Sequence, residues 1–224
     1  MLFLLSMLGA NAAAPISAFV SDFSDAFWQV PINMEERRFF CATTPLRGKR
    51  RYLAFTRAAQ GSGNAPMLWA RVAALIMRLT QALFSPHEVN LMCYVDDPLA
   101  ALQGTDDQRR LSTALIILVW EALGFGLAYS KGQMDASVTW IGGTLTVEAE
   151  GVRAKVKQSI IDDICDDLNS LMKKNVITLV ELHSLVGKLN HAAGLIILIR
   201  PFLEPFMGGG KVGFGSVLFQ DRLI

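Results

Sequence analysis

The chain has 224 residues, of which 52% are hydrophobic and 18% are charged, and its formal net charge at pH 7 is +1. This composition excludes a disordered chain and provides enough apolar surface for one large domain or two small ones. The small net charge hides a segregation, because nine Lys and Arg residues but no Asp or Glu lie between Arg37 and His87. Such a stretch favours contact with a polyanion.

The three cysteines, Cys41, Cys93 and Cys165, are odd in number, far apart and set in apolar runs, which argues against a disulfide framework or a zinc site and favours a reducing compartment. We therefore expect an intracellular location, in the cytoplasm or nucleus. Residues 1–14 contain a short apolar run followed by small residues, as a signal peptide does, but no Lys or Arg precedes the run. A structural segment or a truncation scar is expected there rather than secretion. No apolar run is long enough to cross a membrane.

The first half of the chain predicts strands, a hairpin and one helix. Residues 16–22 read as a buried strand that ends in an acid, followed by a short turn or helix at 25–28. Strands at 37–44 and 51–56 are expected around a basic turn at 45–50. Asn64 as cap and Pro66 in the first turn predict a helix. We expect its core stripe to be Leu68, Val72, Leu75, Ile76, Leu79 and Leu83.

The second half predicts a further hairpin and then helices. Strands at 91–95 and 99–102 are joined by a tight Asp-Asp turn, and a helix at 106–123 is closed by a glycine. Two short strands follow, the second around 139–146. After Gly151 the pattern is expected to be purely helical. The first helix there has a core face of Val156, Ile160, Ile161, Ile164, Leu168, Leu171 and Met172, and the second starts at the capping box Thr178 to Glu181. The order predicts an α+β fold with a boundary near residue 150.

The strongest chemical signal is the pair Asp96-Asp97 within Tyr94-Val95-Asp96-Asp97. Two adjacent carboxylates at the tip of an apolar hairpin repel each other and are costly to desolvate unless a cation holds them. A solvated Asp-Asp turn is the alternative. Asp22 also ends an apolar strand, and a pair of hard divalent cations needs such oxygen ligands from separate strands.

Five segments in order resemble the polymerase motifs of retroviral and retrotransposon reverse transcriptases. They are 22–31 (DFSDAFWQVP), 60–66 (QGSGNAP), 94–97 (YVDD), 126–133 (GLAYSKGQ) and 140–142 (WIG). The segments 185–190 and 200–202 are similar to the thumb region of such elements, those of the tyrosine-recombinase kind in particular. The resemblance implies residues 16–150 as a palm with an antiparallel sheet and helices on one face, and 151–206 as a helical thumb. It leaves 1–15 as an uncertain apolar segment and 207–224 as a tail similar to the start of an RNase H domain.

The resemblance implies RNA-directed DNA synthesis with two Mg²⁺ ions, or Mn²⁺, held by Asp22, Asp96, Asp97 and the carbonyl of Phe23. Deoxynucleoside triphosphates and an RNA or DNA template with primer would be the partners. Asp25 and Ala26 would offer backbone N–H groups to the triphosphate.

The resemblance also implies roles around the nucleotide. Phe27 would act as a steric gate against a 2′-hydroxyl, with an ordinary core aromatic as the alternative. Gln60 and Gly61 would contact the nucleotide and template. Lys131 would be a general acid for pyrophosphate, with a solvated loop lysine as the alternative. The primer end would be held by Trp140, Ile141 and Gly142.

Nucleic-acid phosphates are expected to contact the basic hairpin region through Arg37, Arg38, Arg47, Lys49, Arg50, Arg51 and Arg57. The sequence also departs from the family. Residues 1–15 carry no charge and stand where the fingers' cationic clamp would precede the first motif, so we expect primer-template binding to exceed polymerisation. Two alternatives stay open, namely a degenerate fragment that only binds nucleic acid and a small secreted helical protein. Oligomeric state stays open too.

Overall fold

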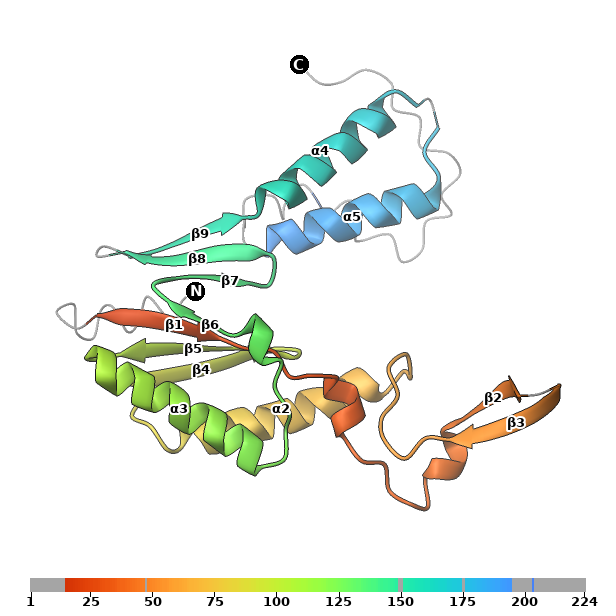
Figure 1. The fold of residues 1–224 in the computed structure, drawn as a ribbon. Coiled ribbons are helices and arrows are strands. Elements are labelled where there is room, and N and C mark those ends of the chain that lie inside the picture. The colour runs from red at the N-terminus through yellow and green to blue at the C-terminus, as the bar shows by residue number, and fades with distance from the viewer. Residues whose placement is uncertain (1–14, 47, 149–150, 175, 195–202, 204–224) are drawn as a thin grey trace. The chain divides into compact units, whose positions relative to one another are not determined.

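The structure is a computed structural model that describes residues 15–46, 48–148, 151–174, 176–194 and 203. Two compact units divide the chain: Met1–Ile141 with Thr146–Val152, and Gly142–Leu145 with Arg153–Ile224. Antiparallel sheets and helices make the fold α+β, as the sequence predicted (Figure 1). No described helix is both long enough and apolar enough to span a bilayer. The expectations for residues 1–14, for 200–202 and for the tail at 207–224 lie outside the described residues.

A four-stranded antiparallel sheet forms the centre of the first unit. Its order is β4 (Val89–Tyr94), β5 (Asp97–Gln103), β1 (Ile16–Val20) and β6 (Gln133–Asp135). Ala18 of β1 pairs with Ala101 on one side and with Asp135 on the other. Every residue of β1 is buried, including the polar Ser17, which explains why its sequence is mostly apolar and does not alternate between apolar and polar residues.

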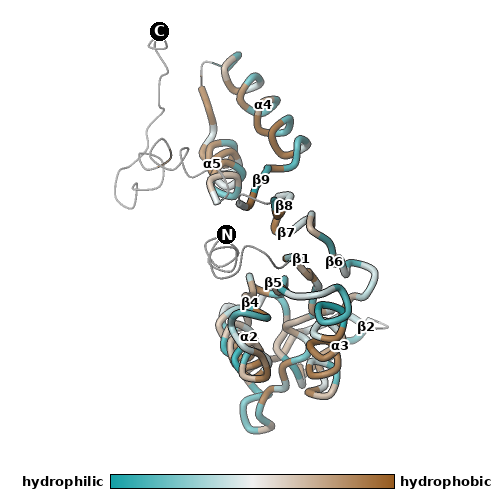
Figure 2. Tube along the Cα trace, turned by 90° about the vertical axis from the view of Figure 1, so that its left-hand side faces the viewer, coloured by the Kyte–Doolittle hydropathy of each residue, from teal (hydrophilic) through white to brown (hydrophobic). Residues whose placement is uncertain are grey.

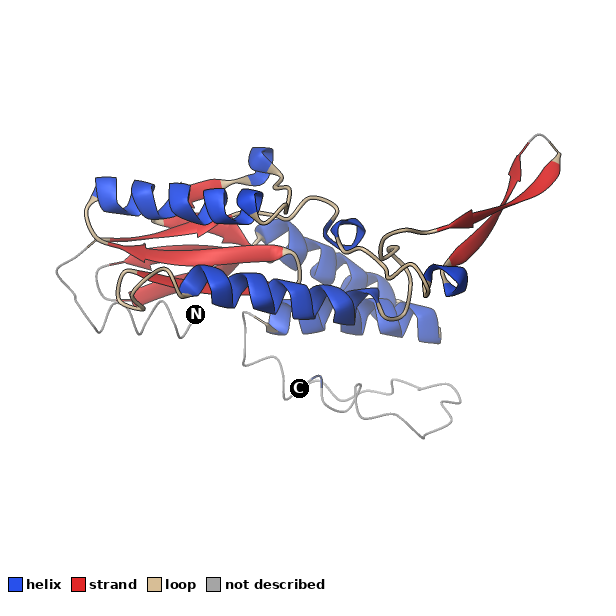
Figure 3. Cartoon of the chain, turned by 90° about the horizontal axis from the view of Figure 1, so that it is seen from below, coloured by secondary structure: helices blue, strands red, loops and turns tan. Residues whose placement is uncertain are grey.

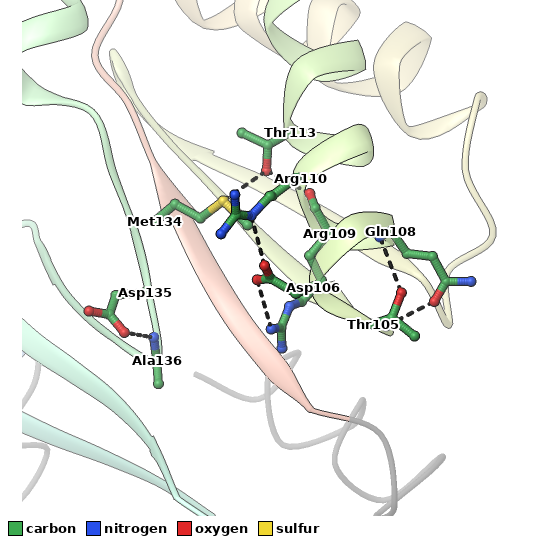
Figure 4. Close-up of polar contacts among 9 residues, drawn as sticks. All are labelled: Thr105, Asp106, Gln108, Arg109, Arg110, Thr113, Met134, Asp135 and Ala136. Atoms are coloured by element: carbon green, nitrogen blue, oxygen red, sulfur yellow. Dashed lines mark hydrogen bonds and ion pairs between the residues drawn. The ribbon is translucent and has the colours of Figure 1, made fainter.

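Two helices, α2 (Ala65–Gln81) and α3 (Asp106–Ala122), lie on the same face of this sheet (Figures 1 and 3). Their core contacts join Trp69 and Trp120 to the strand and loop aromatics Phe19 and Phe23. The α3 helix begins with a capping box, in which Gln108 N donates to Thr105 Oγ1 and Thr105 N donates to Gln108 Oε1 (Figure 4). Asn64, by contrast, stands before α2 without a capping side-chain hydrogen bond.

The predicted core stripe of α2 was wrong in part. Leu75, Leu79 and Leu83 are 50%, 47% and 60% exposed. The buried face of the helix is Ala65, Trp69, Ala73, Ile76, Met77 and Thr80. A leucine count cannot find this face, because the face includes small alanines and the polar Thr80. Thr80 can be buried because its Oγ1 donates to Ile76 O at 2.8 Å and accepts from Trp120 Nε1 at 2.9 Å.

The basic hairpin is β2 (Cys41–Leu46) and β3 (Lys49–Ala54), two strands that pair only with each other (Figure 3). The sequence prediction placed the turn over 45–50, but Pro45 pairs with Arg50 and Leu46 with Lys49. Gly48 has φ +74°, so the connection can tighten to two residues. The first three residues of the predicted strand, Arg37–Phe39, form a 3₁₀ turn (η2) instead.

A three-stranded sheet follows, β7 (Ser137–Trp140), β8 (Gly143–Glu148) and β9 (Gly151–Val156), and the division between the units runs through it. The single strand predicted around 139–146 is broken at Ile141 and Gly142, both with positive φ. The helical prediction for residues after Gly151 was wrong over β9. Exposed Arg153 and Lys155 alternate there with half-buried neighbours, which is the period of a strand.

The second unit pairs α4 (Gln158–Met172) with α5 (Leu179–Ala193). Their buried contact residues are Ile164, Leu171, Leu185 and Ala192. In Figure 2, hydrophobic and hydrophilic stretches alternate along both helices. Met172 was predicted in the core but is 76% exposed. The capping box at Thr178 and Glu181 is confirmed.

Candidate active site

Asp22 follows the end of β1 and is fixed by backbone hydrogen bonds on both sides. Ser21 N donates to Pro98 O at 3.2 Å, and Phe23 N donates to Asp96 O at 3.0 Å. Ala128 N donates to Asp22 O at 2.9 Å. Asp22 is 8% exposed, so a charged side chain lies at a largely buried position between two chain segments that are distant in sequence.

Asp96 and Asp97 lie where β4 turns into β5. Tyr94 pairs with Asp97, which leaves Val95 and Asp96 at the tip of the hairpin. Both aspartates are half-buried. The backbone bond from Phe23 to Asp96 therefore brings the end of β1 to the tip of the next hairpin, and the three acids come from two separate places in the chain.

A cavity of about 370 Å³ opens beside these acids. It is lined by Asp22, Phe23, Ser24, Asp25, Ala26, Phe27, Trp28, Gln60, Asp96, Ala128 and Lys131. The residues come from the loop after β1, from the short 3₁₀ helix η1 (Ala26–Gln29), from the loop before α2, from the β4–β5 tip and from the 3₁₀ turn η3 (Tyr129–Lys131).

Charge in the cavity is concentrated on one ion pair and its neighbours. Lys131 Nζ forms an ion pair with Asp22 Oδ2, and this hydrogen bond raises the pKa of Lys131. Burial raises the pKa of Asp97, and the carboxylates of Asp96 and Asp22 raise it further. Burial, then repulsion from Asp96 and Asp97, raises the pKa of Cys93 to about 12, so this thiol stays neutral. The three carboxylates thus act on one another and share one nearby cation.

The carboxylates alone do not form a closed metal site. Within the described ranges, no set of three His, Cys, Asp or Glu side chains converges closely enough to hold an ion. Mg²⁺ is, however, commonly bound through one or two carboxylates with waters and substrate phosphates completing its shell. The ammonium of Lys131 already places a positive charge against Asp22. Asp22 and Asp96 are the residues that could hold Mg²⁺ together with a phosphate ligand, and an ion bound there would have to share Asp22 with Lys131 or displace it.

The η1 turn is held in place by Gln29, a residue that the sequence did not single out. Its amide donates to Ser24 O and to Gly126 O, the latter at 3.1 Å, and its Oε1 accepts from Gly126 N at 2.9 Å. Asp25 precedes the turn with φ 49°. Across the part of the chain that the structure describes, the backbone N–H groups of Asp25 and Ala26 donate to no carbonyl, so they are free to meet an anion.

The chain has recognisable relatives among polymerases. The family model described as reverse transcriptase (RNA-dependent DNA polymerase) matches residues 10–144. The chain belongs to the reverse transcriptase family. The Gag-Pro-Pol polyprotein of bovine leukemia virus (isolate Australian) is 31% identical over 119 residues, which is 52% of this chain and 8% of that polyprotein.

Among solved structures, the foamy viral protease-reverse transcriptase in complex with double-stranded DNA has a similar fold. The TM-score is 0.62 at 19% identity, over 97% of this chain and 34% of that one. At this identity the likeness supports the fold only. The chain thus corresponds to a reverse transcriptase domain within longer proteins, of which it spans a minor share.

The remaining predicted nucleotide contacts of this reverse transcriptase domain lie at the cavity or beside it. Phe27 is half-buried and both lines the cavity and packs against the core, so its two interpretations are compatible with its position. Gln60 is exposed at the cavity. Gly61 has φ +91°, a conformation that glycine adopts without strain.

The predicted primer-grip residues lie in the turn that follows β7. Trp140 is 7% exposed and its Nε1 donates to Asp97 O at 3.1 Å, so its indole is committed to the first unit. Ile141 and Gly142 form the positive-φ turn. A side chain at Gly142 would meet His191 Nε2 at 2.5 Å. The primer-grip role stays a prediction. Because the Trp140 indole already donates to Asp97 O, such a contact would come from the backbone of this turn.

The predicted cations of the basic hairpin region differ in the groups that they contact. Arg37 Nε donates to Ile32 O at 3.2 Å and Arg57 Nη1 donates to Gln29 O at 3.0 Å, so these two arginines stabilise their own loops. The guanidinium of Arg38 lies 4.8 Å from the centroid of the Phe39 ring. Lys49, Arg50 and Arg51 are exposed along β3, and none of them pairs with an acid among the described residues. Arg47 lies outside the described residues.

A second cavity, of about 430 Å³, lies between the start of β1, the start of α3 and β6. Figure 4 shows Asp106 bound to both Arg109 and Arg110, at 3.5 and 2.8 Å, and Asp135 accepting from Ala136 N at 2.6 Å. Two acids balance two arginines here, unlike the excess of carboxylates at the first cavity.

Proposed function

We propose that this chain catalyses RNA-directed DNA synthesis at the cavity beside Asp22, Asp96 and Asp97. One observation carries the proposal: Asp22, which follows β1, and Asp96 at the β4–β5 tip, far apart in sequence, line one cavity together with Lys131 and Phe27. Asp97 follows Asp96, and burial, together with the carboxylates of Asp96 and Asp22, raises its pKa. A solvated Asp-Asp turn would not require the buried, backbone-fixed Asp22 beside it.

The residues divide the work of nucleotidyl transfer. The primer 3′-hydroxyl oxygen forms a bond to the α-phosphorus of the nucleotide and loses its proton to solvent, while the bond between that phosphorus and the pyrophosphate oxygen breaks. Two magnesium ions, when bound, would stabilise the charge of the triphosphate and lower the pKa of the hydroxyl. Asp22 and Asp96, with the Phe23 carbonyl, would hold them, and Asp97 would lie beside them.

Other residues of the cavity orient the nucleotide and supply a proton. The free N–H groups of Asp25 and Ala26 face the triphosphate, Phe27 lies under the sugar, and Gln60 contacts the base or template. The exposed Lys131 is an ammonium ion whose pKa the hydrogen bond to Asp22 raises, so it holds its proton tightly while that ion pair lasts. To act as a general acid, Lys131 would have to leave Asp22 and donate to the leaving pyrophosphate oxygen instead.

Primer extension on an RNA template with Mg²⁺ tests this function. Asp96→Asn should lower the extension rate at least about a hundredfold, because it removes a preorganised charge at the reacting phosphate. Asp107→Asn is the matched control, since Asp107 is an exposed acid in the first turn of α3 and does not line the cavity. Equal rates for Asp96→Asn and the wild type would contradict the assignment.

The nucleic-acid partner would lie along the exposed cations of β3. Lys49, Arg50 and Arg51 are unpaired in the described structure, and Tyr52 is 74% exposed beside them. Phosphate contacts by such cations release counterions and depend strongly on salt. The finer assignment to a retroelement of the tyrosine-recombinase kind rests on the segments 185–190, in α5, and 200–202, which lies outside the described residues. A recombinase gene beside the source gene would test it.

A further inference from the structure

Three consecutive backbone carbonyls at the β4–β5 tip each accept a hydrogen bond from outside the hairpin. Val95 O accepts from Trp69 Nε1 at 2.6 Å. Asp96 O accepts from Phe23 N at 3.0 Å and Asp97 O from Trp140 Nε1 at 3.1 Å. The peptide that carries the paired acids is thus anchored to α2, to the end of β1 and to β7.

The hydrogen bond to the Val95 carbonyl is made at a residue whose backbone conformation is strained. Val95 has φ 57°, in the left-handed region that a β-branched residue rarely occupies. Its side chain is 47% exposed at the tip of the hairpin, so side-chain packing does little to hold this conformation. Such a conformation persists only where the surrounding structure imposes it.

Trp69 is suited to impose it. The residue is 0% exposed, and its ring packs at 5.3 Å from Phe23 and at 6.2 Å from Phe125. A ring fixed on several sides holds its N–H in one direction. That N–H is buried, and without the Val95 carbonyl it would lack a partner, so the bond favours one orientation of the peptide between Val95 and Asp96.

We propose that Trp69 is a positioning residue that orients the Asp96-Asp97 turn toward Asp22. It acts through the Val95 carbonyl and touches no substrate, because it is fully buried and does not line the cavity. The role in catalysis rests on the proposed polymerase function. The effect on the geometry of the turn does not.

The experiment compares Trp69→Phe with Trp120→Phe. Both tryptophans are 0% exposed and each donates one hydrogen bond through its indole N–H, but Trp120 Nε1 donates to Thr80 Oγ1, which is not part of the turn. Phenylalanine keeps an aromatic ring in the core and removes only the N–H donor and the second ring. A general loss of packing should therefore appear in both variants.

Three readouts are taken on the same preparations: hydrogen–deuterium exchange over residues 89–103, affinity for Mn²⁺ alone, and single-nucleotide extension. Trp69→Phe should speed exchange at the turn, and weaken Mn²⁺ binding and kcat by about tenfold or more with little change in nucleotide KM. Trp120→Phe should leave all three near the wild type, although both variants unfold at lower temperature.

The results test the role of Trp69 and the proposed polymerase function separately. Equal exchange at the turn in the two variants, or wild-type Mn²⁺ affinity and kcat in Trp69→Phe, would overturn the role of Trp69. A wild-type chain that binds no Mn²⁺ and extends no primer would overturn the proposed function instead, while the exchange comparison would still decide whether Trp69 holds the turn.

Discussion

Phe27 stands at the border between the core and the cavity, and its half-buried position makes its role measurable. It packs against the core cluster and lines the cavity beside Asp22. A side chain that only packed in the core would be fully buried, and one that only lined the cavity would be exposed.

Phe27→Ala should allow ribonucleotides to be incorporated more readily while deoxynucleotide incorporation falls less. The lost ring removes a repulsion that acts on the 2′-hydroxyl only. The measurement is the ratio of kcat/KM for a ribonucleotide and its deoxy counterpart. Trp28→Ala is the control for the loss of an aromatic ring from the cavity wall, because Trp28 also lines the cavity while its ring packs 5.7 Å from Phe55. An unchanged ratio in a variant that still extends primers would leave Phe27 as a core residue only.

At the scale of single residues, the sequence predicts the acids of the site better than the residues that hold the backbone around them. Asp22 and Asp96 are visible because each carboxylate ends or joins an apolar strand. Trp69 and Gln29 were missed because both act on backbone carbonyls distant in sequence, Trp69 on Val95 and Gln29 on Gly126. No residue pattern marks a carbonyl as an acceptor, so only the folded chain reveals such contacts.

At the scale of elements, α2 shows which face of a helix the core selects. The expected stripe consisted mainly of leucines, and of its members only Ile76 belongs to the buried face; the other buried residues are two alanines, a tryptophan, a methionine and a threonine. The general order of strands and helices was predictable from periodicity. The facing of α2 was not, because it depends on the shape of the sheet surface and on the Trp120 donor that satisfies Thr80.

Ile76→Ala should therefore destabilise the chain by about 2–4 kcal/mol, since Ile76 is 2% exposed in the core. Leu75→Ala, one position along the same helix, should cost less than about 1 kcal/mol, because Leu75 is 50% exposed. Urea unfolding of both variants checks the contrast. Similar losses at the two positions would mean that α2 buries a different face.

The start of α5 is expected to respond to acid. The hydrogen bond from Lys174, followed by those from Thr178, lowers the pKa of Glu181 to about 2. A carboxyl whose pKa is lowered on folding stabilises the folded state above its unfolded pKa of 4.5, and this contribution is lost as the pH falls toward 2.

Glu181→Gln should remove that part of the pH dependence while keeping an acceptor for the Thr178 N–H. Urea midpoints measured between pH 6 and pH 2 for the variant and the wild type test this. Glu35→Gln serves as a control for the loss of one exposed acid. Parallel curves for Glu181→Gln and the wild type would exclude a role for the charge.

At the scale of the whole molecule, the near-zero net charge conceals one strongly basic surface. The cations of β3 are exposed, whereas Arg37 and Arg57 are engaged with carbonyls of their own loops. Binding of a primer-template should therefore depend more on Arg50 and Arg51 than on the other arginines of the basic stretch.

Arg50→Ala with Arg51→Ala should weaken primer-template binding and reduce the slope of log K against log salt by about 0.7–0.9 for each phosphate that the variant no longer neutralises. Arg71→Ala with Arg78→Ala is the matched control, since both arginines are exposed on α2. Fluorescence anisotropy at several salt concentrations gives the slopes. The same decrease in both double variants would show that binding follows total charge and not the hairpin.

The position of β1 in its sheet sets the order in which the chain can fold. β1 comes first, but its partners β5 and β6 are synthesised much later, and both of its edges are unpaired until they arrive. Such long-range antiparallel pairing closes large loops and is slow compared with the formation of α2 or α3. An unpaired, largely apolar strand is prone to join other chains in the meantime, so aggregation is favoured until β1 is paired. The acids of the cavity meet only when this pairing is complete.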